Sequence, residues 1–534
     1  MATLTYHRKP NGTTYVYRQE SHWDKSKRRT TTTQVCLGKL NQHKEIIYNK
    51  RFSDPVAREA LDKGELVSES LITGQSLVLS SATQSCGLYQ VMRQVLSAEK
   101  ADFLLSLAWA VCALDGKMYH ASTWIEQNDC PANKLAPRSQ DISRALAGIS
   151  QDDVDSFQRA WITHRSKGLS EHYCFDITSV SSRNARNPFV EWGHNRDKEA
   201  IPQINLALLT SVATRIPVYY EVLPGSMSDV KAMTSFLKRM EKYSIGRIRM
   251  LLDRGFYSAS NIDELLAGHV GFYIPVPANV KVYQELIDLN RDNLEMPENI
   301  ISVTEDNKDA VYGMTMLGKI SGKRVWQHIY YDTARRTEHI LSFFAKLSMW
   351  EQELLSGNTS EANTWAYERY FTVKETPKRG RQVKRRQEEI NKYKQDRAGY
   401  WVILTNCEKD ASRALTAYRE RSLVENQFDD LKNELDMHRI RTHNSETMRG
   451  RLLVQFLALV ICSVIRQGLD VAWNDRNNPG DDRFTRRYSL SETMLRLGSY
   501  RKTRISGRYG TVVSTPTKTQ REIFKAFGIT TQST

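Results

Sequence analysis

The sequence has few of the features that mark disulfide-rich, zinc-binding or secreted proteins. Its seven cysteines are widely spaced, their number is odd, and none lies in a CxxC pair. This pattern argues against a disulfide framework and against a zinc site, and favours reduced thiols inside a cell. The first residues, MATLTYHRKPNG, lack the apolar core of a signal peptide. We therefore expect a soluble protein of the cytoplasm.

Long apolar runs are also scarce. The most apolar stretch is LLVQFLALVICSVI, residues 452–465, and it contains Gln455. It is too short to cross a bilayer, so it predicts a buried core helix and no membrane partner. The sequence has no internal repeat and no long low-complexity segment.

Positive charge is what the sequence has in excess. The formal net charge is +15 over 534 residues. Such an excess of Lys and Arg usually meets a polyanion, and nucleic acid is the commonest one. The alternative is a basic protein without such a partner.

Two consecutive sections of the chain are rich in predicted strands. The runs EHYCFDITSV, INLALLTSVA and RIPVYYEVLPG are short and rich in β-branched and aromatic residues, and predict three strands in a meander. The runs IGRIRMLLDRGFYS and VGFYIPVP predict two more strands, with helices before and between them. Such alternation is typical of a mixed sheet with helices on its faces.

A helix predicted from Tyr418 onward carries a stripe of functional side chains. On a helical wheel Tyr418, Arg421, Glu425 and Lys432 fall within an arc of about 60°. An apolar seam lies beside them, so the stripe borders the buried face, where a core helix meets a cleft. The seam consists of Val424, Phe428, Leu431 and Leu435. The alternative is a solvated helix with an Arg421–Glu425 ion pair.

Two aspartates lie on predicted strands, where acids are rare. Asp176 is in the middle of one strand, and Asp253 ends another. Strands that are neighbours in a sheet can bring the two acids together, and Glu425 can join them from the later helix. Crowded carboxylates repel unless a cation neutralises them, and oxygen ligands without His or Cys select Mg²⁺ or Mn²⁺. Two such ions can activate a water or a 3′-OH for attack on a phosphodiester.

These residues resemble a known family. YRERSLVENQFDDLK fits the pattern Y-x2-R-x3-E-x6-K, which marks DDE transposases of bacterial insertion sequences that move by cut and paste. DITSV and LPGSMSD…LLDRGFYS are similar to the stretches around their first and second aspartates. VYRQESHWDKSKRR…VCLGKL is similar to the start of the longer-chain branch of that group.

The resemblance implies a fold, a chemistry and partners. The expected fold is α/β: a ribonuclease-H-like mixed sheet flanked by helices, interrupted by a β-rich insertion, with a small N-terminal β module and a helical DNA-binding region. Asp176, Asp253 and Glu425 are implied to be catalytic and to bind two Mg²⁺, with Mn²⁺ as a substitute. The partners are double-stranded DNA, from transposon ends and target, and a second copy of the chain in the DNA complex. The cell is implied to be bacterial, with the protein associated with the nucleoid.

Five residues are expected to bind DNA. Tyr418, Arg421 and Lys432 are expected to contact phosphates flanking the cut and to balance the charge of the transition state. Arg254 joins them because it follows Asp253 directly. Trp326 is a candidate for stabilising an unstacked base, although a packed core Trp is the alternative. Whether the cut passes through a hairpin intermediate is left open.

The expected boundaries follow the changes in pattern. They are a basic N-terminal β module (1–84), a helical DNA-binding or linker region (85–169), the core in two parts (170–280 and 399–470), an insertion (281–398) and a basic C-terminal region (471–534). The run Lys374–Arg397 either contacts phosphate or is a solvated loop. Asp197, Asp332 and Asp429 are acids that could be mistaken for ligands. Two other functions stay open: a ribonuclease-H-like nuclease that cuts without joining, and a catalytically silent DNA-binding protein.

Overall fold

The structure is a computed structural model whose chain forms two compact units. Unit 1 comprises Met1–Tyr89, Ala98–Ile142 and Val464–Thr534, and unit 2 comprises Gln90–Ser97 and Ser143–Ser463. The structure describes residues 2–10, 12–24, 29–41, 44–49, 68–135, 137–165, 171–184, 186–243, 248–305, 308–377, 380–442, 444–475, 488–505 and 510–531.

Unit 1 contains two small antiparallel sheets and a group of helices. The predicted N-terminal strands form the order β1-β2-β3-β4, and a second sheet has the order β18-β17-β5. The strands are β1 (Ala2–Arg8), β2 (Thr14–Asp24), β3 (Arg29–Leu40), β4 (Ile46–Tyr48), β5 (Ser68–Ile72), β17 (Arg501–Ile505) and β18 (Gly510–Val513). The helices are α2 (Gly74–Ser85), α4 (Ala98–Ala113), η1 (Met118–His120), α5 (Ala121–Gln127), η2 (Asn133–Leu135), α17 (Leu490–Leu497) and α18 (Lys518–Ala526).

The strands β17 and β18 lie in the C-terminal region, for which the sequence predicted positive charge but no strand. The residues of β17, RKTRI, lack the apolar alternation that signals a strand. They become a strand because they pair with β5, more than 400 residues earlier in the chain. A partner so distant in sequence cannot be read from a local pattern.

Unit 2 is built on a nine-stranded mixed sheet with the order β11-β12-β13-β16-β10-β9-β6-β7-β8. The predicted meander is confirmed, because β6–β7 and β7–β8 pair antiparallel. Strand β9 lies parallel between β6 and β10. The strands are β6 (His172–Ser181), β7 (Gln203–Ser211), β8 (Pro217–Pro224), β9 (Arg249–Leu252), β10 (Gly271–Pro275), β11 (Ile300–Val303), β12 (Ala310–Ile320), β13 (Lys323–Asp332) and β16 (Tyr400–Thr405).

Alternation along β6 divides its side chains between two faces of the sheet. Tyr173, Phe175 and Ile177 belong to the main hydrophobic core, which also contains residues of α8, α9 and α10. The intervening Cys174 points the other way, and its thiol donates to the carbonyl of Glu420, the residue that follows helix α14 (Ala411–Arg419). Asp176 shares that second face, so a carboxylate is tolerated in a strand whose other face is core.

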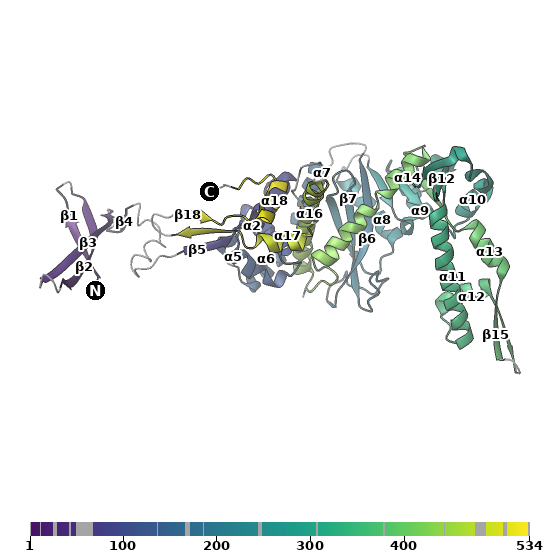
Figure 1. Ribbon diagram of the computed structural model, residues 1–534, viewed down its shortest axis with the longest axis horizontal. Coiled ribbons are helices and arrows are strands. Elements are labelled where there is room, and N and C mark those ends of the chain that lie inside the picture. Colours follow the sequence, from purple (N-terminus) through teal and green to yellow (C-terminus); the bar gives the residue numbers. More distant parts are fainter. Residues whose placement is uncertain are drawn as a thin grey trace. The chain divides into compact units, whose positions relative to one another are not determined.

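Helices cover both faces of this sheet (Figure 1). They are α7 (Gln151–Arg165), α8 (Asp229–Lys242), η3 (Arg254–Phe256), α9 (Ala259–Ala267), α10 (Lys281–Leu294), η4 (Pro297–Asn299), α14 (Ala411–Arg419), α15 (Ser422–Asp429) and η6 (Asp430–Glu434). Within the described ranges, the remaining helices outside the predicted insertion are α3 (Leu88–Val95), α6 (Ser139–Ala147) and α16 (Ser445–Asp475).

Helix α16 is longer than the apolar run that predicted it. By length and composition alone, Ser445–Trp473 is the one helix in the described ranges that could cross a membrane. However, 78% of its most apolar window is buried inside the protein. That burial agrees with the expected core helix, in which Phe456 packs against Phe157 and Tyr220.

The segment 281–398, expected to be a β-rich insertion, contributes both to the sheet and to a second core. Strands β12 and β13 form a hairpin that extends the main sheet, because β13 pairs with β16. The elements after it are α11 (Thr333–Ser356), η5 (Glu361–Asn363), α12 (Thr364–Tyr370), β14 (Phe371–Thr376), β15 (Gly380–Arg385) and α13 (Gln387–Asp396). They lie together around Phe343, Trp350 and Tyr370 (Figure 1). The basic run contains residues of β14, all of β15 and helix α13. The alternative of a solvated loop therefore does not describe these elements, and contact with phosphate stays a prediction.

Candidate active site

The two strand-borne aspartates lie on adjacent parallel strands. Phe175 of β6 is in register with Leu252 of β9, and the acid is the next residue on each strand. The Asp176 side chain is only 19% exposed, whereas that of Asp253 is 41% exposed. The Asp176 Oδ1 atom accepts a hydrogen bond from the Ile177 backbone N–H at 2.8 Å. The sheet itself therefore fixes the two predicted acids side by side.

The guanidinium of Arg421 joins these aspartates to the third predicted acid. Its Nη1 atom lies 4.0 Å from Asp176 Oδ2 and 3.9 Å from Asp253 Oδ1. Its Nη2 atom donates to Glu425 Oε1 at 2.7 Å. The ring of Tyr418 lies 6.0 Å from the Arg421 Cζ atom. Five predicted site residues thus form one cluster around the Arg421 guanidinium: Asp176, Asp253, Tyr418, Arg421 and Glu425.

Electrostatics at this cluster raise the pKa of Asp176 from its ordinary 3.8 to about 6. Burial is the largest cause of this increase, and the negative charge of Asp253 contributes to it. The Ile177 N–H and the positive charges of Arg421 and Arg196 lower this pKa, but by less. Burial also raises the pKa of Tyr418 to about 12. A second cation near Asp176 would therefore favour its ionised form.

The cation that the three acids share is the Arg421 side chain and not a metal ion. Within the described ranges, no group of three His, Cys, Asp or Glu side chains is close enough to hold a metal ion. The three acids are therefore not arranged as a ligand set in this structure, and their binding of metal stays a prediction. The physical reason is that Arg421 sits among them and binds Glu425. All three acids offer oxygen ligands, which Mg²⁺ prefers, and Glu425, with a 55% exposed side chain, has room to turn.

The helix that carries the stripe is not continuous. Helix α14 ends at Arg419, and the Arg421 N–H bonds to the Tyr418 carbonyl in a tight i to i+3 turn. Helix α15 then leads into one turn of π-helix, η6, in which the Leu435 N–H bonds to the Asp430 carbonyl. The apolar seam is nevertheless buried as predicted. A tightened turn and a widened turn change the phase of the helix, so the wheel misplaces residues at the far end of the stripe.

Lys432 is the residue that this change of phase displaces. Its Nζ atom forms a short ion pair with Asp197 Oδ1 at 2.5 Å, and both side chains are largely buried. The other carboxylate oxygen of Asp197 lies 3.7 Å from His438 Nδ1. Lys432 is therefore not brought to the three acids, and its contact with DNA stays a prediction. From the sequence, Asp197 was only an acid that could be mistaken for a metal ligand. Its role as the ion-pair partner of Lys432, 235 residues later, becomes visible only in the structure.

One ion pair beside the cluster was missed. Arg196 Nη2 lies 2.6 Å from Asp229 Oδ1, and Arg196 also acts on the pKa of Asp176. Asp229 Oδ2 would lie 2.9 Å from a Cβ atom added to Gly255. Asp229 thus contacts the turn that follows Asp253. The sequence signalled only a helix start at Asp229, because Arg196 lies in a segment without a periodic pattern.

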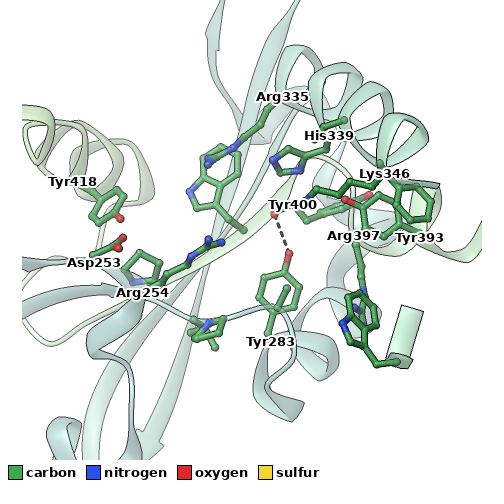
Figure 2. Close-up of a pocket in the computed structure, with 18 of the residues that line it drawn as sticks. Asp253, Arg254, Tyr283, Arg335, His339, Lys346, Tyr393, Arg397, Tyr400 and Tyr418 are labelled. Atoms are coloured by element: carbon green, nitrogen blue, oxygen red, sulfur yellow. Dashed lines mark hydrogen bonds between the residues drawn. The ribbon is translucent and has the colours of Figure 1, made fainter. Parts of the chain in front are cut away.

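A cavity of about 730 Å³ opens beside Asp253. Figure 2 shows Asp253, Arg254 and Tyr418 at one side of it, with Arg335, His339, Lys346 and Arg397 at the other. Its remaining lining is largely aromatic. These aromatic residues are Tyr283, Phe343, Trp350, Trp365, Tyr370, Tyr393, Tyr400 and Trp401. Such a surface can stack flat rings and neutralise phosphate at once.

Arg254 and Trp326, the two remaining predicted DNA-binding residues, differ in their position relative to this cavity. Arg254 is exposed and lines this cavity next to Asp253. Trp326 does not line it; this half-buried residue is paired on β13 with Leu317 and Thr405. The tryptophans at the cavity are instead Trp350, Trp365 and Trp401. Of these, Trp365 is 56% exposed. The sequence could not choose among tryptophans because the cavity combines distant segments.

Comparison with known proteins identifies the family. A family model described as "Transposase DDE domain" matches residues 167–461, more than half of the 534 residues. The chain belongs to the transposase DDE domain family. In this transposase-family chain the matched segment contains Asp176, Asp253 and Glu425, and also Arg421, which links them.

One solved structure similar to this transposase-family chain is the cryo-EM structure of the piggyBac transposase synaptic complex with hairpin DNA. The TM-score is 0.38 at 11% sequence identity, and the match covers 79% of this chain and 76% of that chain. No curated protein matches the chain.

Proposed function

We propose that this protein is a DNA transposase that binds terminal inverted repeats, cleaves the element ends and joins the freed 3′-OH ends to target DNA. One observation carries the proposal. Asp176, Asp253 and Glu425, which come from two strands and a helix, all contact the Arg421 guanidinium. This cluster lies inside the segment that matches the transposase family model.

The sheet supports a ribonuclease-H-like core. Strands β8, β7 and β6 form an antiparallel meander, and β9 and β10 continue the sheet parallel to β6. The first acid lies on the central β6 and the second follows β9. In our proposal this core carries the chemistry, and segment 281–398 supplies the aromatic cavity beside it.

We propose Mg²⁺, with Mn²⁺ as a substitute, as the cofactor that Asp176, Asp253 and Glu425 would hold. Two such ions would activate a water or a 3′-OH and stabilise the leaving oxygen of a phosphodiester. The position of the Arg421 guanidinium supports the fit, because all three acids already reach one cation. For a full ligand set, Glu425 must leave Arg421.

In this proposal the neighbouring side chains bind and orient DNA. Once Glu425 has left it, the guanidinium of Arg421 offers paired N–H donors to a phosphate oxygen. Tyr418, which lies beside Arg421 and lines the cavity, would offer its protonated hydroxyl as a hydrogen-bond donor to DNA. Arg254, Arg335 and Lys346 line the cavity as further cations. The aromatic side chains between them would stack an unpaired base.

The partner is double-stranded DNA from element ends and target, which accords with the family and with a net charge of +15. A second copy of the chain would hold the other end of the element, so that both ends meet one target. We place this activity in the bacterial cytoplasm, where the nucleoid supplies the target.

The test uses purified protein, Mg²⁺ and a DNA fragment that ends in the element's own terminal repeat. Glu425→Ala should abolish both cutting and joining while DNA binding survives. Asp429→Ala is the matched control, because it removes an exposed carboxylate from the same helix α15 and should leave both reactions intact. Cutting without joining in the wild type would favour a nuclease, and binding without cutting would favour a silent DNA-binding protein. Full activity of Glu425→Ala would remove that residue from the mechanism.

A further inference from the structure

A second cleft of unit 2 is rich in arginine and lies away from the acids. Its volume is about 810 Å³. Its lining consists of residues 181–184 and Arg186, residues 439–442, and Ile201. We name it the arginine cleft after Arg183, Arg186, Arg439 and Arg441, all of which are exposed. None of its lining residues is acidic.

Backbone hydrogen bonds hold the two segments together. The Ser181 N–H, at the end of β6, donates to the His438 carbonyl at 3.0 Å, and the Ile440 N–H donates to the Ser181 carbonyl at 2.9 Å. Arg439 therefore forms a single parallel bridge with Ser181 at the end of β6. The turn after β6 is closed by Asn184, whose Oδ1 atom accepts from the Arg186 N–H at 3.1 Å. The arginines thus extend from a fixed backbone.

Most of this charge is not neutralised within the protein. Arg439 forms a two-oxygen ion pair with Glu199. For Arg183, Arg186 and Arg441, the described ranges contain no acidic partner within ion-pair distance. The Asn184 Nδ2 atom at the same cleft has no hydrogen-bond partner in those ranges. Three free guanidinium groups around one cleft form a surface for an anion with several oxygens.

We propose that the arginine cleft binds the phosphodiester backbone of duplex DNA, beyond the nucleotide that is cut. This inference rests on the proposed function and adds a contact site to it. Asp176 and Ser181 are five residues apart on β6, which is about 17 Å along a strand. Duplex DNA advances about 3.4 Å per base pair. The cleft is therefore far enough from Asp176 to contact a phosphate other than the one that reacts, and it recognises charge and not sequence.

The experiment measures the affinity of the full-length protein for a short DNA duplex of arbitrary sequence over a series of salt concentrations. The variant combines Arg183→Ala, Arg186→Ala and Arg441→Ala. Each phosphate contact contributes about 0.9 to the slope of log affinity against log salt. The triple variant should therefore show a slope shallower by about 2.7. The matched control removes three exposed cations of unit 2 elsewhere: Lys231→Ala, Lys238→Ala and Arg324→Ala.

Each outcome separates this inference from the proposed function. An unchanged control slope together with a shallower triple-variant slope supports the cleft. Equal slopes for wild type and triple variant overturn it, even if the wild type still cuts and joins DNA. A wild type that fails to bind any duplex contradicts the proposed function itself. Loss of inorganic phosphate binding without a change in the DNA slope would make the cleft a small-anion site and would also overturn the inference.

Discussion

Asp176→Asn should stabilise the metal-free protein at neutral and higher pH. The wild-type carboxyl lies on β6 with a side chain only 19% exposed, beside Asp253. Asparagine has nearly the same shape, and its Oδ1 atom can still accept from the Ile177 N–H. The substitution therefore removes a charge and leaves the packing almost unchanged.

The magnitude follows from the pKa of Asp176, which burial raises from 3.8 to about 6. A raised folded-state pKa means that the unfolded chain ionises first. The stability contribution of the neutral carboxyl is thus complete below pH 3.8 and is lost as the pH rises through about 6. Above that pH the folded wild type carries a penalty of about 3 kcal/mol, which the Asn variant lacks.

Urea unfolding of wild type and variant at several pH values measures this difference. At about pH 8 the variant should unfold at higher urea, and near pH 4 the two proteins should unfold together. Added Mg²⁺ should then stabilise the wild type and have little effect on the variant, since binding to the folded state alone raises stability. A variant that is equally or less stable than wild type at the higher pH would refute the burial argument.

Three further perturbations test other parts of the site. Lys432→Met should destabilise the protein by roughly 2 kcal/mol because it leaves the carboxylate of Asp197 unpaired, and adding Asp197→Asn should restore most of the lost stability. Urea unfolding of the wild type, the two single variants and the double variant measures the coupling energy between the two residues. A coupling energy of zero would contradict a structural ion pair. Arg421→Ala should raise the pKa of Asp176, since Arg421 lowers it, which a shift of the pH-stability profile to higher pH would reveal and an unshifted profile would exclude. Trp365→Ala should weaken binding of DNA with unpaired ends by about 1–3 kcal/mol, whereas Trp192→Ala, which removes a 67% exposed tryptophan outside the cavity lining, should not; equal effects would argue against stacking in the cavity.

The parts of the site that depend on regular strands were predictable from the sequence. The apolar runs around Asp176 and Asp253 signalled two strands, and the β6–β9 pairing places the acids in adjacent register. Glu425 follows from helical spacing because it is one turn from Arg421. These inferences needed only local periodicity and the rule that strand ends gather at one edge.

The rest depended on interactions that local patterns do not encode. A tightened turn before α15 and a π-turn after it shift Lys432, and neither has a signature in the residue types. The ion pair between Lys432 and Asp197 joins segments 235 residues apart. Trp326 was the candidate from the sequence, and Trp365 was not considered, because only the fold reveals which segments surround the cavity.

The pairing of β13 with β16 means that the strands before β16 cannot be deleted without exposing an edge of the main sheet. Strand β16 is bonded on one side to β10 and on the other to β13. A deletion that removed β11–β13 would expose a row of unpaired backbone N–H and C=O groups along β16, whose residues are mostly apolar. Such an open margin invites strand-to-strand aggregation. The β12–β13 hairpin therefore cannot be removed without consequence. A shortened protein would need another strand, helix or loop to protect the exposed edge of β16.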